Sequence, residues 1–279
     1  MKKFHKMSLA VLCIFVTLFS AACAKAPKQE EDTEWVFNSI HTYNQDRVKQ
    51  FSKTIITETA SGTYEKTQTL ISDSNNDILY MSCVQKGPGN YHLYTRDYMM
   101  LKDGKGYDIY KYDTQETFYK TEINTDFINN AFNSMYIILS DKAEAKILGN
   151  ETVDGTDAVK VLVTDRDFPR IQNSSDFSKL YAQAVVSDVY QEELKAAHDN
   201  YMNMKEKEWT FWFSKEDSRL LKMEYDNTLD TTFTYYTLAA ANQGICAEKN
   251  VPSKEIVTGY IKSGNDCDKI EVPLEYQTL

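Results

Sequence analysis

Short runs of β-branched and aromatic residues alternate with polar residues along most of the chain, and glycine, proline, asparagine and aspartate separate the runs. This pattern is typical of antiparallel strands joined by tight turns. The clearest example covers residues 91–123, where Asp103-Gly104 and Asp113-Thr114 interrupt tyrosine-rich runs. The same pattern predicts strands at 54–59, 64–72, 78–85, 91–102, 106–112, 117–123, 145–150, 158–164, 209–213, 219–225 and 231–238.

Three stretches have apolar residues at helical spacing instead. They are 35–51, 124–139 and about 174–207, the last with an expected break near Ser187-Asp188. Asn124 precedes the second stretch as a candidate N-cap residue. These elements predict an α+β fold, in which helices cover one face of a curved antiparallel sheet. We expect one domain over residues 34–279, with a tail from about 242 that wraps loosely and adds one or two short strands.

The first 22 residues have the features of an export signal, namely a basic start, an apolar run and small residues before Cys23. This order resembles a bacterial lipoprotein signal, although Ser20 stands where that signal prefers leucine. The resemblance implies that Cys23 carries a lipid and becomes the mature N-terminus. A plain secretory signal with an incidental Cys23 is the alternative. Residues 23–33 are polar and predict a flexible tether.

The remaining cysteines fit an oxidising exterior. Cys246 and Cys267 could close a disulfide, whereas Cys83 lies in a predicted strand and is expected as a small buried residue. We therefore expect an extracytoplasmic protein that its lipid anchors to the bacterial cell membrane.

The charge of the chain excludes one class of partner. The formal net charge is −10, which opposes binding to the phosphate backbone of nucleic acids. We expect no nucleic-acid partner.

The sequence contains no recognisable catalytic or metal-binding pattern. His41, His92 and His198 lie in three separate predicted elements, without the spacing of a zinc site. No GxSxG motif and no phosphate-binding loop occurs either. We therefore predict no enzyme and no cofactor, and an envelope hydrolase is disfavoured.

Three hairpin patterns resemble the LolA-like superfamily of lipoprotein carriers, which includes the LppX-type lipoproteins. They are the Asp103-Gly104 turn with its following aromatic strand to Asp113, the hairpin with Glu151, Val153 and Gly155, and the strand pair 209–225. The long helical stretch and the residues after 242 depart from the pattern. The resemblance implies an unclosed half-barrel whose concave side is covered by helices and holds an apolar cavity.

The aromatic side chains are the candidates for ligand contacts, because rings offer apolar area at low entropic cost. In the alternative interpretation they form only the core and its rim. The candidate ligand-binding residues are Tyr107, Tyr110, Phe132, Met135, Trp209, Phe211 and Trp212. We accordingly expect an apolar or lipid-like ligand. The other possibility is a non-enzymatic interaction or sensory module that contacts an envelope protein.

Overall fold

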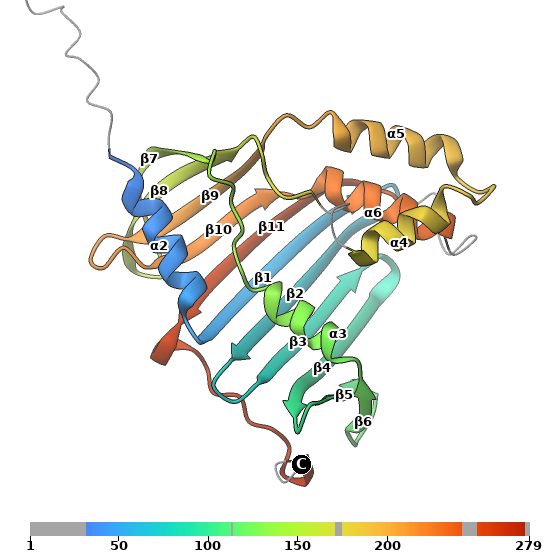
Figure 1. Cartoon of the computed structure of the whole chain (residues 1–279), viewed down its shortest axis with the longest axis horizontal. Helices are drawn as coiled ribbons and strands as arrows, with labels where there is room; N and C mark the ends of the chain where they lie inside the picture. The colour runs from blue at the N-terminus through green and yellow to red at the C-terminus, as the bar shows by residue number, and fades with distance from the viewer. Residues whose placement is uncertain (1–31, 113, 171–174, 242–249, 277–279) are drawn as a thin grey trace, which may run out of the picture. The chain divides into compact units, whose positions relative to one another are not determined.

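The described residues of the computed structural model, which are 32–112, 114–170, 175–241 and 250–276, contain one antiparallel sheet of 11 strands. The strands are β1 (Val48–Thr59), β2 (Gly62–Asp73), β3 (Ile78–Gly87), β4 (Tyr91–Lys102), β5 (Lys105–Tyr112), β6 (Tyr119–Ile123), β7 (Glu144–Val153), β8 (Thr156–Asp165), β9 (Lys207–Ser214), β10 (Leu220–Asp226) and β11 (Pro252–Ser263). Their spatial order is β6-β5-β4-β3-β2-β1-β11-β10-β9-β8-β7, so β6 and β7 form the two edges. The sheet is strongly curved and does not close into a barrel (Figure 1).

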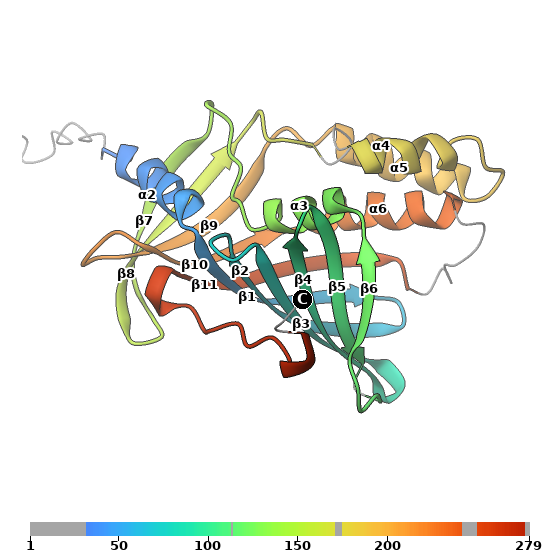
Figure 2. The ribbon, with the colours of Figure 1, turned by 60° about the horizontal axis from the view of Figure 1, so that its bottom comes forward.

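The helices lie on the concave face of this sheet (Figure 2). They are α2 (Glu34–Gln45), α3 (Thr125–Asn133), α4 (Ser175–Ala184), α5 (Gln191–Met202) and α6 (Thr228–Ala241). The residues after β11 pass over the opposite, convex face. There the side chain of Gln50 donates a hydrogen bond to the carboxylate of Asp268 and accepts one from its backbone amide. The predicted α+β half-barrel with helices on its concave side is confirmed.

Two hairpin turns show why the local sequence folds as a meander. Asp103 and Gly104 have φ angles of 52° and 75°, and Asp154 and Gly155 have 47° and 82°. A two-residue turn with positive φ at both positions matches the twist of the flanking strands, and aspartate followed by glycine tolerates that geometry. These turns set the register of β4 with β5 and of β7 with β8.

The main core lies between α2 and the concave face. Val36, Ile40 and Tyr43 of α2 pack against Phe211 and Phe213 of β9 and against neighbouring strands. A second cluster joins α4, α5 and α6 to one another. The predicted break in the long helical stretch is present, because α4 ends at Ala184 and α5 begins at Gln191.

The predicted helix at 124–139 is too long, because α3 ends at Asn133. Asn124 does cap it, as its side chain accepts a hydrogen bond from the Asp126 amide. After the helix, Ile137 exchanges two hydrogen bonds with the side chain of Asn44 on α2. This contact holds the following segment in an extended path, and its apolar residues reach the core without helical geometry.

The prediction of a strand at 231–238 is wrong, since these residues belong to α6. Its threonine and aromatic residues favour strands by composition. However, the Thr228 amide binds the side chain of Asp226, which starts the helix, and Phe233 and Thr237 lie one turn apart and are both buried. Packing against α4 and α5 therefore overrides the local preference.

The expectation of a loosely wrapped tail is also wrong for residues 252–263. They form β11, a 12-residue strand between β1 and β10 in the centre of the sheet. Lys49 pairs with Ser263 and Lys222 with Tyr260. Pairing across some 200 residues of chain leaves no local signal, and Gly259 interrupts the apolar alternation of the strand.

Candidate ligand-binding hollow

The concave face divides into a packed part and a more open part. Phe51 of β1 belongs to the core under α2, so Lys53, Ile55 and Thr57 point to the same face because side chains alternate along a strand. These three residues are half-buried rather than buried. We use the term hollow for the part of the concave face near the β1–β2 turn, which is lined by side chains of β1 to β5. They are Lys53, Ile55, Thr57, Tyr64, Lys66, Gln68, Cys83, Gln85, Leu93, Thr95, Asp97 and Tyr110.

One end of the hollow opens into a pocket of about 500 Å³. Thr57, Tyr64 and Gln85 line it together with Tyr91 and other residues of the adjoining turns. The rings of Tyr64 and Tyr91 meet edge to face at 6.3 Å between centroids. A pocket of this size with amphipathic rings at its rim can admit part of a small organic ligand.

Two lysines enter the hollow from neighbouring strands. Burial, with a smaller contribution from repulsion by the nearby Lys66, lowers the pKa of Lys53 to about 8, although Glu255 and Cys83 oppose the change. The Nζ atom of Lys53 lies 5.6 Å from the centre of the Phe51 ring. Neither lysine forms an ion pair with a carboxylate within the described part of the chain.

Two aspartates lie deeper along the same face, on β4 and β5. Burial, with a smaller contribution from the charge of Asp108, raises the pKa of Asp97 to about 6, although a hydrogen bond from Thr95 opposes the rise. Burial also raises the pKa of Asp108. Its Oδ1 atom is buried and has no hydrogen-bond partner among the described residues.

Glu255 of β11 marks the side of the hollow next to α6. Its carboxylate accepts hydrogen bonds from Thr57 at 2.8 Å, from Asn227 at 2.8 Å and from the hydroxyl of Thr231 at 2.5 Å. This buried acid is therefore already satisfied by neutral donors. It adds negative charge beside Lys53 without a direct contact.

The structure separates the predicted ligand-binding residues into three groups. Tyr110 points into the hollow, where its ring stacks on Tyr119 at 5.8 Å. Met135 and Phe211 are buried and Trp209 is half-buried in the main core, while Phe132 packs with Ile128 between α3 and the sheet.

The other two residues lie on the convex face. Tyr107 shares a face of β5 with Ile109, and the Nζ atom of Lys120, which is opposite Ile109 on β6, lies 4.2 Å from the centre of the Tyr107 ring. Trp212 is buried there between Lys160 and Lys222, and its indole N–H donates to Glu151. The structure thus brings only Tyr110 of the predicted set into the hollow, and a role of the others in ligand contact stays a prediction.

Sequence reasoning did not single out the polar residues of the hollow. Their signal is the alternation itself, because Phe51, Lys53 and Ile55 share one parity on β1. A charged residue at an inward-facing strand position is uncommon. The parity of β1 alone could have identified Lys53. It could not have identified Lys66 as its neighbour, because that proximity depends on the register of β1 with β2.

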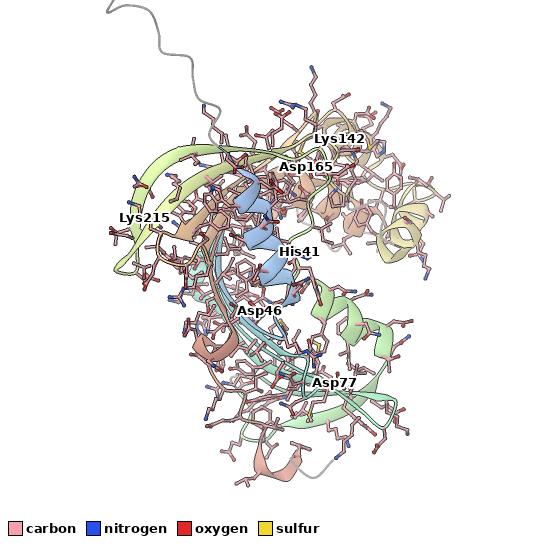
Figure 3. The ribbon with its side chains drawn as sticks, turned by 60° about the vertical axis from the view of Figure 1, so that its left-hand side comes forward. His41, Asp46, Asp77, Lys142, Asp165 and Lys215 are labelled. Atoms are coloured by element: carbon pink, nitrogen blue, oxygen red, sulfur yellow. The ribbon has the colours of Figure 1, made fainter. Side chains whose placement is uncertain are left out.

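Several predicted features lie outside the residues that the structure describes. They are the signal peptide, the lipid-bearing Cys23, most of the tether, and Cys246 as partner of Cys267. Within the described part of the chain no group of three or more histidine, cysteine or acidic side chains could hold a metal ion. His41 lies on α2 (Figure 3), where the Nε2 atom of its ring is 2.7 Å from the Nε2 atom of Gln45. None of the described helices is both long and apolar enough to cross a membrane.

No protein-family model and no curated protein matches the chain. Solved structures do match over most of it. LprF from Mycobacterium bovis has 10% identity and a TM-score of 0.44, over 86% of this chain and 95% of that one. The lipoprotein LppX from Mycobacterium tuberculosis has 8% identity and a TM-score of 0.40, over 85% and 97%. A LolA superfamily protein from Nitrosomonas europaea has 10% identity and a TM-score of 0.22, over 87% and 94%.

This chain resembles LolA-like proteins in fold. With such low identities and with TM-scores below 0.5, these matches do not name a ligand. The ligand has to be argued from the side chains of the hollow.

Proposed function

We propose that this protein is an extracytoplasmic lipoprotein, anchored by a lipid on Cys23, that binds or carries an apolar or lipid-like ligand in the hollow. The observation that supports binding is the half-buried concave face of β1 to β3, which leads to the tyrosine-lined pocket of about 500 Å³. A sheet face that served only as core would be packed by the helices as closely as β9 is packed by α2.

Ligand binding can be tested by a substitution on β3 that fills the pocket. Gln85 lines the pocket, whereas the preceding Val84 points to the convex face of the same strand. With the purified full-length chain, we expect Gln85→Trp to lower the uptake of a pyrene-labelled C16 alcohol about tenfold or more, because the indole fills the opening. Val84→Trp should leave uptake within about twofold. Equal uptake by both variants and the original protein, or no uptake at all, would exclude binding in the hollow.

The anchor is tested separately by labelling cells with an alkyne fatty acid. We expect Cys23→Ser to abolish incorporation of the label and to release the protein from the membrane fraction, because the thioether can form only on a thiol. Cys13→Ser, a control in the same predicted signal, should keep the label. Label that persists in Cys23→Ser would contradict the predicted site of attachment.

A further inference from the structure

Two lysines lie side by side in the hollow with unused hydrogen-bond donors. Lys53 faces Gln68 across β1 and β2, and Lys66 stands two residues from Gln68 on the same face of β2. Both side chains are half-buried. Each ammonium has three N–H donors, and among the described residues neither has a carboxylate within ion-pair distance. Lost hydration of two such cations is costly unless an anion replaces it.

The acids near these lysines do not supply that anion. Glu255 is occupied by Thr57, Asn227 and Thr231. Asp97 lies two strands away from Lys66, across β3, and is also displaced along the strands, because it is level with Leu70 of β2 rather than with Lys66. Neither acid therefore pairs with the two lysines at the point where β1 and β2 meet in the hollow.

Apolar side chains flank the lysines in the same cross-strand row. Ile55 faces Lys66 from β1, Lys66 faces Gln85 on β3, and Gln85 faces Leu93 on β4. Ile55 is half-buried and Leu93 is exposed. A cationic centre between two accessible apolar side chains, at the edge of the pocket, suits a molecule with one acidic group and a hydrocarbon part.

We propose that the hollow binds an anionic amphiphile, whose carboxylate or phosphate lies between the ammonium groups of Lys53 and Lys66 and whose hydrocarbon part lies along Ile55 and Leu93. This inference rests on the proposed function, because it names the class of ligand for the same hollow. The shared chemistry is one acidic group on an acyl chain, and a free fatty acid and an anionic phospholipid both have it.

The pKa of Lys53 gives the proposal a second consequence. Lys66 on β2, Cys83 on β3 and Glu255 on β11 are the titratable groups that influence it, and burial lowers it to about 8. A bound anion favours the charged ammonium and raises this pKa. Binding near pH 8 therefore takes up protons, and affinity for the acid falls as the pH rises above 8.

The experiment compares ligands of equal chain length with the purified full-length chain at submicellar concentration. The ligands are a pyrene-labelled C16 acid and the matching alcohol. We expect the acid to bind at least about tenfold more tightly than the alcohol at pH 7, which is the effect of a charge-assisted contact. That preference should shrink at pH 9.5. A further arm compares labelled phosphatidylglycerol with the matching diacylglycerol in vesicles, and it distinguishes a phospholipid from a free fatty acid.

The variant Lys53→Met/Lys66→Met keeps the apolar stems and removes both charges. We expect it to lose the preference for the acid, with a thermal midpoint no lower than that of the original protein, because two half-buried charges are removed. The control Lys120→Met/Lys146→Met changes two exposed lysines outside the hollow and should keep the preference. Equal binding of acid and alcohol by the original protein, or equal losses in the hollow variant and the control, would overturn the anionic ligand while leaving the proposed function intact. Binding of neither ligand would overturn the proposed function itself.

Discussion

Asp97 shows how one residue of the hollow affects the stability of the whole chain. It lies on the concave face of β4 between Met81 of β3 and Tyr110 of β5. Burial raises its pKa from 3.8 to about 6 in the folded protein. Between these two pH values the folded state holds more protons than the unfolded state, so the free energy of unfolding falls as the pH rises. The charged carboxylate is thus tolerated at neutral pH at a cost in stability.

We expect Asp97→Asn to remove this cost. At pH 7.5 the variant should be more stable than the original protein by on the order of 1 kcal/mol, a figure that allows for the partial exposure of Asp97. At pH 4 the two proteins should be nearly equally stable. Denaturant unfolding at both pH values measures the difference. The control Asp157→Asn changes an exposed aspartate and should have the same small effect at both. A stability gain that does not depend on pH would contradict the argument.

At the scale of elements, the helices are fixed to the sheet by polar contacts as well as by their apolar faces. The carboxylate of Asp165 at the end of β8 accepts hydrogen bonds from the amide and the hydroxyl of Ser140; Asp165 and the nearby Lys142 are labelled in Figure 3. Asn44 at the end of α2 binds both backbone groups of Ile137. These contacts determine where the segment between α3 and β7 crosses the concave face.

The contact of Asn44 can be tested by a single substitution. We expect Asn44→Ala to lower the free energy of unfolding by about 1–3 kcal/mol, because it leaves two backbone groups of a half-buried residue without partners. The amide of Ile137 should also exchange its hydrogen faster. Asn38→Ala removes an exposed asparagine of the same helix and should cost less than about 0.5 kcal/mol. Similar losses in both variants would show that the contact has no special role.

At the scale of the whole sheet, β11 joins two groups of antiparallel strands. One half is the meander β1 to β6, and the other consists of β7 to β10. β11 pairs with β1 on one side and with β10 on the other. Curvature across all these strands forms the concave face, so the hollow depends on the last strand of the chain.

We expect deletion of residues 252–279 to abolish cooperative unfolding, because β1 and β10 then lose their common partner and the core under α2 is exposed. Deletion of residues 264–279 leaves β11 in place and should keep a cooperative transition at lower stability. Circular dichroism during denaturant unfolding distinguishes the two outcomes. A cooperative transition of undiminished amplitude in the longer deletion would show that the halves do not need β11.

The sequence by itself determined the features that depend on neighbouring residues. Alternation and Asp-Gly turns predicted the strands of the meander, helical spacing located α2, α3, α4 and α5, and the class of fold followed from their order. Turn geometry and side-chain parity act over a few residues, so a single sequence contains them.

The tertiary structure alone decided the features that depend on distant partners. It placed residues 252–263 in the centre of the sheet, turned residues 231–238 into a helix, and assigned Tyr107 and Trp212 to the convex face. It also brought Lys53 and Lys66 together, since their proximity follows from the register of β1 with β2. Pairing energy and burial arise between segments far apart in the chain, and no local pattern encodes which segments will meet.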